Sequence, residues 1–204
     1  AYNASERNHI QQVLQNANVN MSKVDFFLFQ TDDYWMRDNG PIYVFDQNGQ
    51  LQITDWDFNG WGNSAPFQKD ELVPQRVSNA TGVPRVDVTA MVLEGGAIEI
   101  DGQGSALLCR SSVTNSNRNP GLTESQVESY LTTYLGVTNF IWLDGTPGLD
   151  ITDFHIDGFA RFLDENTIIT LDSLDLIDWG TTPADIHTLY SAQKPGGGGY
   201  QYLF

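Results

Sequence analysis

The sequence predicts an α/β fold in which ββαβ modules repeat around a pseudo-symmetry axis, as in an α/β propeller. The main observation is an acidic corner that occurs three times, beginning at Asp38, Glu94 and Asp157, with spacings of 56 and 63 residues. Each corner passes a small residue, continues as a short strand pattern and ends in a turn. Repetition at a near-constant spacing indicates one supersecondary unit used several times.

The opening segment predicts a helix and a strand without a corner of their own. Ser5 is a favourable cap for a helix over residues 6–17, where apolar residues recur every three or four positions. The apolar run at residues 24–29 predicts a buried strand. We interpret residues 1–30 as the tail of another module. This tail and the apolar, aromatic residues 200–204 together predict that the chain is a piece of a longer repeat protein.

The first module with its own corner spans residues 31–90. The turn at residues 47–49, Gln-Asn-Gly, is a hairpin signal, and Pro74 interrupts the helix candidate that follows. The predicted elements are, in order, a strand over 41–46, a strand over 50–58, a helix over 68–82 and a strand over 83–88.

The second and third modules, residues 91–145 and 150–204, repeat this order. Thr123 and Gln126 form a capping-box pair, and Thr182-Pro183 is a favoured helix start. The second module is predicted to have strands over 97–101, 105–109 and 138–143, a loop over 111–121 and a helix that stops at Gly136. The third module is predicted to have strands over 159–163, 167–171 and 200–204 and a flexible loop over 195–199. We assign all four segments to one incomplete domain over residues 1–204.

Composition limits the class of partner. A net charge of −16 argues against nucleic acid, because phosphate binding needs clustered Lys and Arg. The charge fits a cationic ligand, high solubility or a salt-adapted source. No apolar run approaches the ~20 residues of a membrane span, and no signal-peptide pattern opens the chain, which slightly favours a cytoplasmic location. A single cysteine, Cys109, excludes an internal disulfide and a Cys-based zinc site.

The three leading acids indicate a binding site for a cation. If equivalent corners meet at the axis of the repeat, Asp38, Glu94 and Asp157 come together. Carboxylates at close range repel one another unless a positive charge lies between them. The alternative for each acid alone is a turn residue or a solvated loop residue.

Four motifs, in this order and at these intervals, resemble the agmatine deiminase and bacterial, Porphyromonas-type peptidyl-arginine deiminase family. The resemblance covers roughly residues 24–194. The motifs are Thr-Asp-Asp-Tyr-Trp-Met-Arg-Asp-Asn-Gly-Pro at 31–41, Leu-Glu-Gly-Gly at 93–96, Asn-Arg-Asn-Pro at 117–120 and Phe-His-Ile-Asp at 154–157. The resemblance implies a five-module, pentein-like α/β propeller, of which about three modules are present here. It also implies hydrolysis of a guanidinium to a ureido group and ammonia, without a metal or organic cofactor.

The resemblance implies a role for each matching residue. Asp38 and Asp157 would bind the guanidinium, which suits bidentate carboxylates. His155 would be the general acid and base, with Glu94 in the same network, orienting His155 or the substrate. Trp35 could cover the guanidinium plane by a cation–π contact.

Each of these residues also has a structural interpretation. His155 alone could be a hydrogen-bonded structural histidine, and Trp35 a core residue. Arg118 is interpreted as a structural residue that ties loops together. Asp144, Asp150 and Asp153 suggest a calcium loop, but their spacing fits no EF-hand pattern.

The family nucleophile has no match in this sequence. The resemblance implies a cysteine thiolate in the last module, after a Gly-Gly-Gly-Asn stretch. The glycines at 196–199 have neither the Asn nor a following Cys. Cys109 lies in an apolar strand pattern, away from the corner, where a cysteine has little thiolate character.

Three hypotheses follow for the function. The first is a deiminase acting on agmatine, arginine or peptidyl arginine, represented here by an incomplete chain. The second is a non-catalytic protein that binds guanidinium or polyamine ligands. The third is a structural remnant that folds with a partner. All three leave a homo-oligomer possible, and the first two predict a small cationic ligand as the partner.

Overall fold

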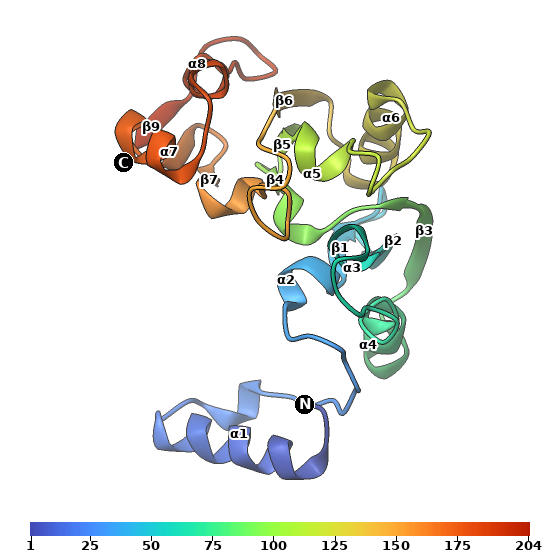
Figure 1. Cartoon of the computed structure of the whole chain (residues 1–204). Helices are drawn as coiled ribbons and strands as arrows, with labels where there is room; N and C mark the ends of the chain where they lie inside the picture. The colour runs from blue at the N-terminus through green and yellow to red at the C-terminus, as the bar shows by residue number, and fades with distance from the viewer.

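The computed structural model describes all residues, 1–204, and confirms an α/β fold built from three similar sheets (Figure 1). Each sheet has three strands. The first strand pairs antiparallel with the second, and the second pairs parallel with the third. A parallel neighbour requires a crossover connection, and a helix supplies it in every sheet. The predicted ββαβ order is therefore present three times.

The first sheet contains β1 (Ile42–Phe45), β2 (Leu51–Asp57) and β3 (Arg85–Val92), and α4 (Val73–Thr81) crosses between β2 and β3. Two short helices flank the corner, α2 (Met36–Asn39) and α3 (Gly60–Asn63). The predicted helix over 68–82 begins too early. Pro74 lies in the first turn of α4, where its missing N–H has no intrahelical partner to lose, so it starts the helix instead of interrupting it.

The second sheet contains β4 (Ile98–Ile100), β5 (Ser105–Cys109) and β6 (Asn139–Leu143), preceded by the turn η2 (Gly95–Ala97). The crossover helix α6 (Glu124–Leu135) has the predicted capping box, and it ends at Gly136 with a φ of +73°. The loop predicted over 111–121 is wrong at its start. A short helix, α5 (Arg110–Val113), continues directly from β5.

The third sheet contains β7 (Ala160–Asp164), β8 (Thr167–Thr170) and β9 (Gln201–Leu203), and α8 (Pro183–Tyr190) crosses to β9. The turn η3 (Ile156–Gly158) precedes β7. The helix α7 (Ser173–Trp179) was not predicted from the sequence. Its signals were local, because Asp172 caps the amides of Leu174 and Asp175, and Gly180 ends the helix with a φ of +108°.

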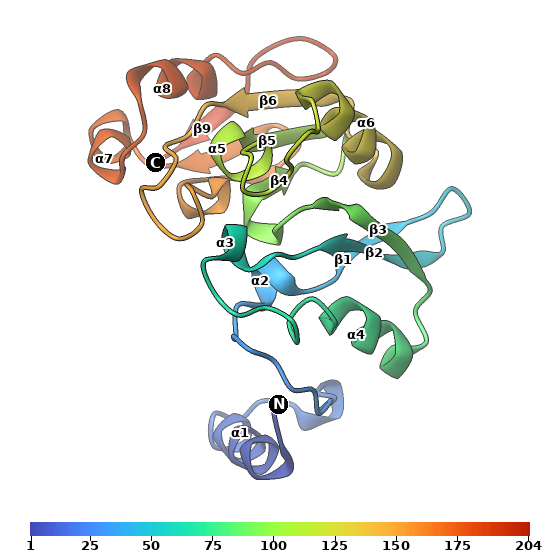
Figure 2. The ribbon, with the colours of Figure 1, turned by 45° about the vertical axis from the view of Figure 1, so that its right-hand side comes forward.

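The first 30 residues form an arm that lies apart from the sheets in both views of the chain (Figures 1 and 2). The arm carries α1 (Ala4–Asn16) and the turn η1 (Met21–Lys23). Asn3, not the predicted Ser5, caps α1 by accepting from the amide of Glu6. The strand predicted at 24–29 is wrong. This run is extended, but apart from two backbone bonds with Ala1 it has no neighbouring strand to complete a ladder.

Two apolar clusters join each sheet to the next. β5 is buried on both faces, and its side chains alternate between the clusters. Ala106 and Leu108 pack with residues of β3 and α6, whereas Leu107 and Cys109 pack with residues of the third sheet. This packing sets the modules side by side, so that their acidic corners face the same region. None of the helices is both long enough and apolar enough to cross a bilayer.

A carboxyl cluster on the first sheet makes stability depend on pH. Burial raises the pKa of Glu71 to about 7, although the amide of Phe58 donates to its carboxylate and opposes the shift. The charges of Asp57, Asp55 and Asp87 raise this pKa further. The folded state therefore holds a proton that the unfolded chain releases near pH ~4.3.

We expect the free energy of unfolding to fall as the pH rises from about 5 to about 7, and Glu71→Gln to remove this part of the slope. Because Glu71 is partly exposed, the expected gain of the variant at pH 8 is ~1–2 kcal/mol. Urea unfolding of both proteins at pH 5, 6, 7 and 8 measures it. The exposed Glu165→Gln is the matched control and should follow the wild type. If the free energy of unfolding of Glu71→Gln changes with pH as steeply as that of the wild type, the prediction is contradicted.

Candidate active site

Four predicted residues, Asp38, Glu94, His155 and Asp157, meet where the three modules join. They come from α2, the segment between β3 and η2, and the start of η3. Asp38, His155 and Asp157 line a cavity of about 420 Å³, and Glu94 lies behind His155. The predicted convergence of acidic corners at one point is present in the structure.

Gly96 lies at the centre of this group. A Cβ atom at this position would lie 2.5 Å from His155 Nδ1, 2.6 Å from Asp38 Oδ1 and 3.1 Å from Asp157 Oδ1. The backbone here does not have a positive φ, so the glycine is needed for space and not for its conformation. The second corner thus contributes a backbone segment without a side chain, against which the acids of the other two corners pack.

Asp38 is held by one donor on each carboxylate oxygen. The amide of Gly96 donates to Oδ1 at 3.0 Å, and Trp61 Nε1 donates to Oδ2 at 3.0 Å. Trp61 is buried, and it lies in the left-handed region with a φ of +54° between two glycines. Trp61 was not predicted from the sequence as a site residue. Its only signal was the run Asn59-Gly60-Trp61-Gly62, which is typical of a tight turn.

His155 pairs with two acids. Its Nε2 lies 2.7 Å from Glu94 Oε2, and its Nδ1 lies 3.5 Å from Asp38 Oδ1. Burial alone would lower the pKa of His155, but the hydrogen bond to Glu94 and the charges of the surrounding carboxylates outweigh it and raise the pKa. The imidazole is therefore more basic than a free histidine, which suits a group that delivers a proton to a departing amine.

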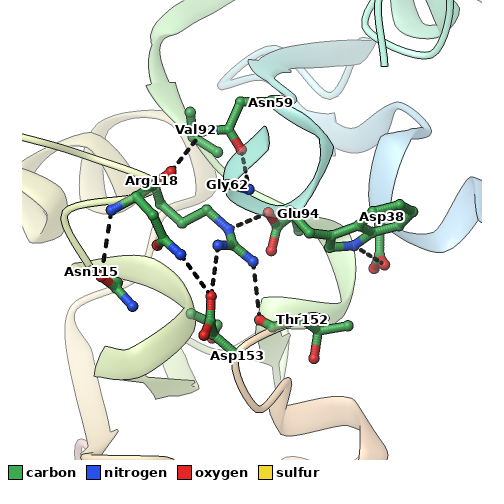
Figure 3. A network of polar contacts seen from close by, with 12 residues as sticks. Asp38, Asn59, Gly62, Val92, Glu94, Asn115, Arg118, Thr152 and Asp153 are labelled. Carbon is green, nitrogen blue, oxygen red and sulfur yellow. Dashed lines mark hydrogen bonds and ion pairs between the residues drawn. The ribbon is translucent and has the colours of Figure 1, made fainter. Parts of the chain in front are cut away.

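Glu94 is held in turn by a buried arginine (Figure 3). Arg118 Nε donates to Glu94 Oε1 at 2.6 Å, and its Nη1 donates to Asp153 Oδ2 at 2.8 Å. The third donor, Nη2, reaches the carbonyl oxygen of Thr152 at 3.2 Å. Arg118 does tie loops together, and it also completes a line of groups from Asp153 to His155. The sequence indicated the first role only.

The hydrogen-bond donor to Asp157 is a charged side chain, that of Arg37. Arg37 Nε lies 3.2 Å from Asp157 Oδ2, across 120 positions of the sequence. Arg37 stands directly before Asp38, but it was not predicted from the sequence as a site residue. Asp157 Oδ1 points toward Gly96, on the same side as the His155 ring. One oxygen of Asp157 therefore faces an arginine, and the other faces the centre of the site.

The family model described as Porphyromonas-type peptidyl-arginine deiminase matches residues 2–188. This chain belongs to that family. It is 33% identical to agmatine deiminase of Pseudomonas syringae pv. tomato over 174 residues, which cover 83% of this chain and 45% of that protein. It is 38% identical to agmatine deiminase of Stutzerimonas stutzeri over 138 residues, which cover 65% of this chain and 38% of that protein.

The fold is also that of a solved relative. The structure of agmatine deiminase of Enterococcus faecalis superimposes with a TM-score of 0.80 at 26% identity, covering 94% of this chain and 55% of that one. The chain thus contains part of a pentein-type propeller and spans less than half the length of the two curated deiminases.

Within this deiminase family member, the cavity also has an aromatic and acidic lining. Trp35 is half exposed and packs against Tyr34 in a tilted arrangement, with ring centroids 4.9 Å apart. It is therefore not a core residue. Trp179 lines the cavity as well, and Asp33 and Asp150 add two carboxylates. Asp150 accepts from the amide of Thr152 within its own loop.

Cys109 does not line this cavity. It is completely buried on β5, and its side chain belongs to the cluster between the second and third sheets. Burial, together with the nearby charge of Asp185, raises the pKa of its thiol well above the ordinary value. A thiol in this state supplies almost no thiolate at neutral pH, so Cys109 is not suited to nucleophilic attack.

Proposed function

We propose that this chain supplies the guanidinium-binding acids and the proton-transfer histidine of a deiminase. The observation that carries the proposal is the meeting of Asp38, His155 and Asp157 around Gly96, with Glu94 behind the histidine. In the reaction, water replaces one nitrogen of a guanidinium, so that the products are a ureido compound and ammonium. All atoms balance without an oxidant or reductant.

The acids determine how the substrate would be oriented. A guanidinium is planar, and its N–H groups would point at the free lone pairs of Asp38 and Asp157. Fixing the plane in this way presents its central carbon to a nucleophile. Protonated His155 would give its proton to the leaving nitrogen, and the neutral imidazole would then take one from the attacking water. The family resemblance implies that a cysteine thiolate outside these 204 residues makes the first attack.

We propose agmatine as the substrate, in preference to arginine. Both first-named relatives are called agmatine deiminases. Asp33 and Asp150 lie beside the guanidinium site, and the only arginine lining the cavity, Arg37, is already paired with Asp157. Such a rim favours a second positive charge on the substrate and disfavours a carboxylate.

The test of catalysis uses the longest open reading frame that contains this chain. We expect the purified product to release ammonia from agmatine faster than from arginine or a peptide with a terminal arginine. His155→Asn should lower the rate by at least about a hundredfold, because general acid–base catalysis contributes about that much or more. The exposed His187→Asn is the control. Absence of ammonia from all three substrates would refute the proposed reaction.

The binding part of the proposal can be tested on the 204 residues themselves. Agmatine at 100 times its dissociation constant should stabilise the folded chain by about 2.7 kcal/mol, which raises the melting temperature by several degrees. Asp157→Asn should abolish this stabilisation, and Asp164→Asn, at the exposed last residue of β7, should retain it. If agmatine stabilises the Asp157→Asn protein as much as the wild type, ligand binding is elsewhere.

A further inference from the structure

A row of four alternating charges connects the three modules beside the candidate site. In order, these charges are Arg161, Glu99, Arg37 and Asp157. Arg161 Nη2 lies 3.0 Å from Glu99 Oε1, and Arg37 Nη2 lies 2.6 Å from the same oxygen. Arg37 Nε then reaches Asp157 Oδ2 at 3.2 Å. We propose that Glu99 is a positioning residue that aims Arg37, and through it the carboxylate of Asp157, for guanidinium binding. This inference rests on the proposed function.

Asp157 needs such support more than Asp38 does. Asp38 is held by the indole of Trp61 and a backbone amide, both rigid donors in a buried setting. The side chain of Asp157 is 21% exposed, and the donor that it receives is the side chain of Arg37, which is itself 45% exposed. A long exposed side chain has many rotamers, so the direction of Asp157 depends on what holds Arg37.

Glu99 is placed to hold it. Its side chain is only 7% exposed, and it lies on β4 of the second module, facing Arg37 of the first and Arg161 of the third. Burial raises the pKa of Glu99, and the charges of Arg161 and Arg37 oppose that shift. Two cations share one buried oxygen of Glu99, and the loss of both would leave a buried carboxylate unpaired, which is costly.

Glu99 also lies outside the substrate cavity. It lines a second cavity of about 430 Å³, together with Arg161, whereas Arg37 lines both cavities. Arg37 is therefore shared between Asp157 on one side and Glu99 on the other. Glu99 and the carbonyl oxygen of Ile98 accept from Nη2, Nε reaches Asp157 Oδ2, and Asp157 Oδ1 faces Gly96. Without Glu99, Arg37 would be free to pair with both oxygens of Asp157. It would then compete with the substrate, because the side chain of Arg37 and the substrate both carry a guanidinium group.

The test compares Glu99→Gln with the wild type by calorimetric titration of agmatine. We expect the dissociation constant to rise about tenfold, as for other residues that orient a binding group. Arg161→Gln, at an exposed position, should act in the same direction with a smaller effect and serves if Glu99→Gln unfolds. Glu124→Gln is the matched control, because it removes a carboxylate 2.6 Å from another arginine, Arg110, away from the site.

Two further readouts separate positioning from a merely structural role. In an Arg37→Gln background, Glu99→Gln should add no further loss of affinity, because Glu99 acts through Arg37 and both changes act on one interaction. Without ligand, solvent exchange of the Arg37 Nε–H, measured by ¹⁵N NMR, should be faster in Glu99→Gln than in the wild type. Additive losses, or unchanged exchange at Arg37, would overturn the proposal while leaving the proposed function in place. If the wild-type product of the longest open reading frame neither binds agmatine nor releases ammonia from it, the proposed function is refuted, and the positioning role with it, whatever the exchange rate.

Discussion

Replacing Arg118 by methionine is expected to destabilise the protein by about 3–5 kcal/mol, because removing one partner of a buried ion pair leaves the other charge uncompensated. The side chains of Arg118 and Glu94 are completely buried, and Asp153 is 11% exposed. Methionine retains most of the volume, so packing changes little. Chemical unfolding at pH 7 measures the loss.

Two comparisons decide whether the charge is the cause. Arg110→Met removes a partly exposed arginine that also pairs with two carboxylates, Glu124 and Asp144, and should cost less than about 1 kcal/mol. Adding Glu94→Gln to Arg118→Met should recover part of the stability, since it removes one of the unpaired charges. A loss below about 1 kcal/mol for Arg118→Met would show that the network contributes little.

Replacing Gly96 by alanine is expected to weaken agmatine binding by about a hundredfold, the scale of effect that a displacement of about 1 Å has in a precise site. The added methyl would overlap His155 Nδ1 and Asp38 Oδ1, which must move apart to admit it. The cost in stability should be smaller, about 1–3 kcal/mol, as for other overpacked sites. Titration of agmatine and thermal unfolding of the same sample separate the two effects.

Gly196→Ala is the matched control for this change. No atom lies within 4 Å of a Cβ at Gly196, and its φ is not positive, so binding and stability should both remain as in the wild type. If Gly96→Ala binds agmatine with wild-type affinity, the region around Gly96 is not the guanidinium site.

Much of the fold was predictable because its signals are local. The hairpin turns, the capping box at Thr123 and the cap at Thr182 are each decided by residues within a few positions, and all three appear in the structure. The errors were of two kinds. A strand over 24–29 required a partner strand that local pattern does not reveal. At Asp172 and Pro74, the helix start signals were present but were not used.

The site divides in a similar way. The sequence by itself determined which acids lead the three corners, because the corner repeats along the chain, and the family resemblance singled out the histidine two residues before the last of them. Only the tertiary structure decided what holds them. Asp38 is held by Trp61, which lies 23 positions away in the sequence, and Glu94 is held by Arg118, 24 positions away. Asp157 is held by Arg37, 120 positions away. Such pairs depend on how whole modules pack, and packing is set by the two apolar clusters that join the sheets and not by any short pattern of residues.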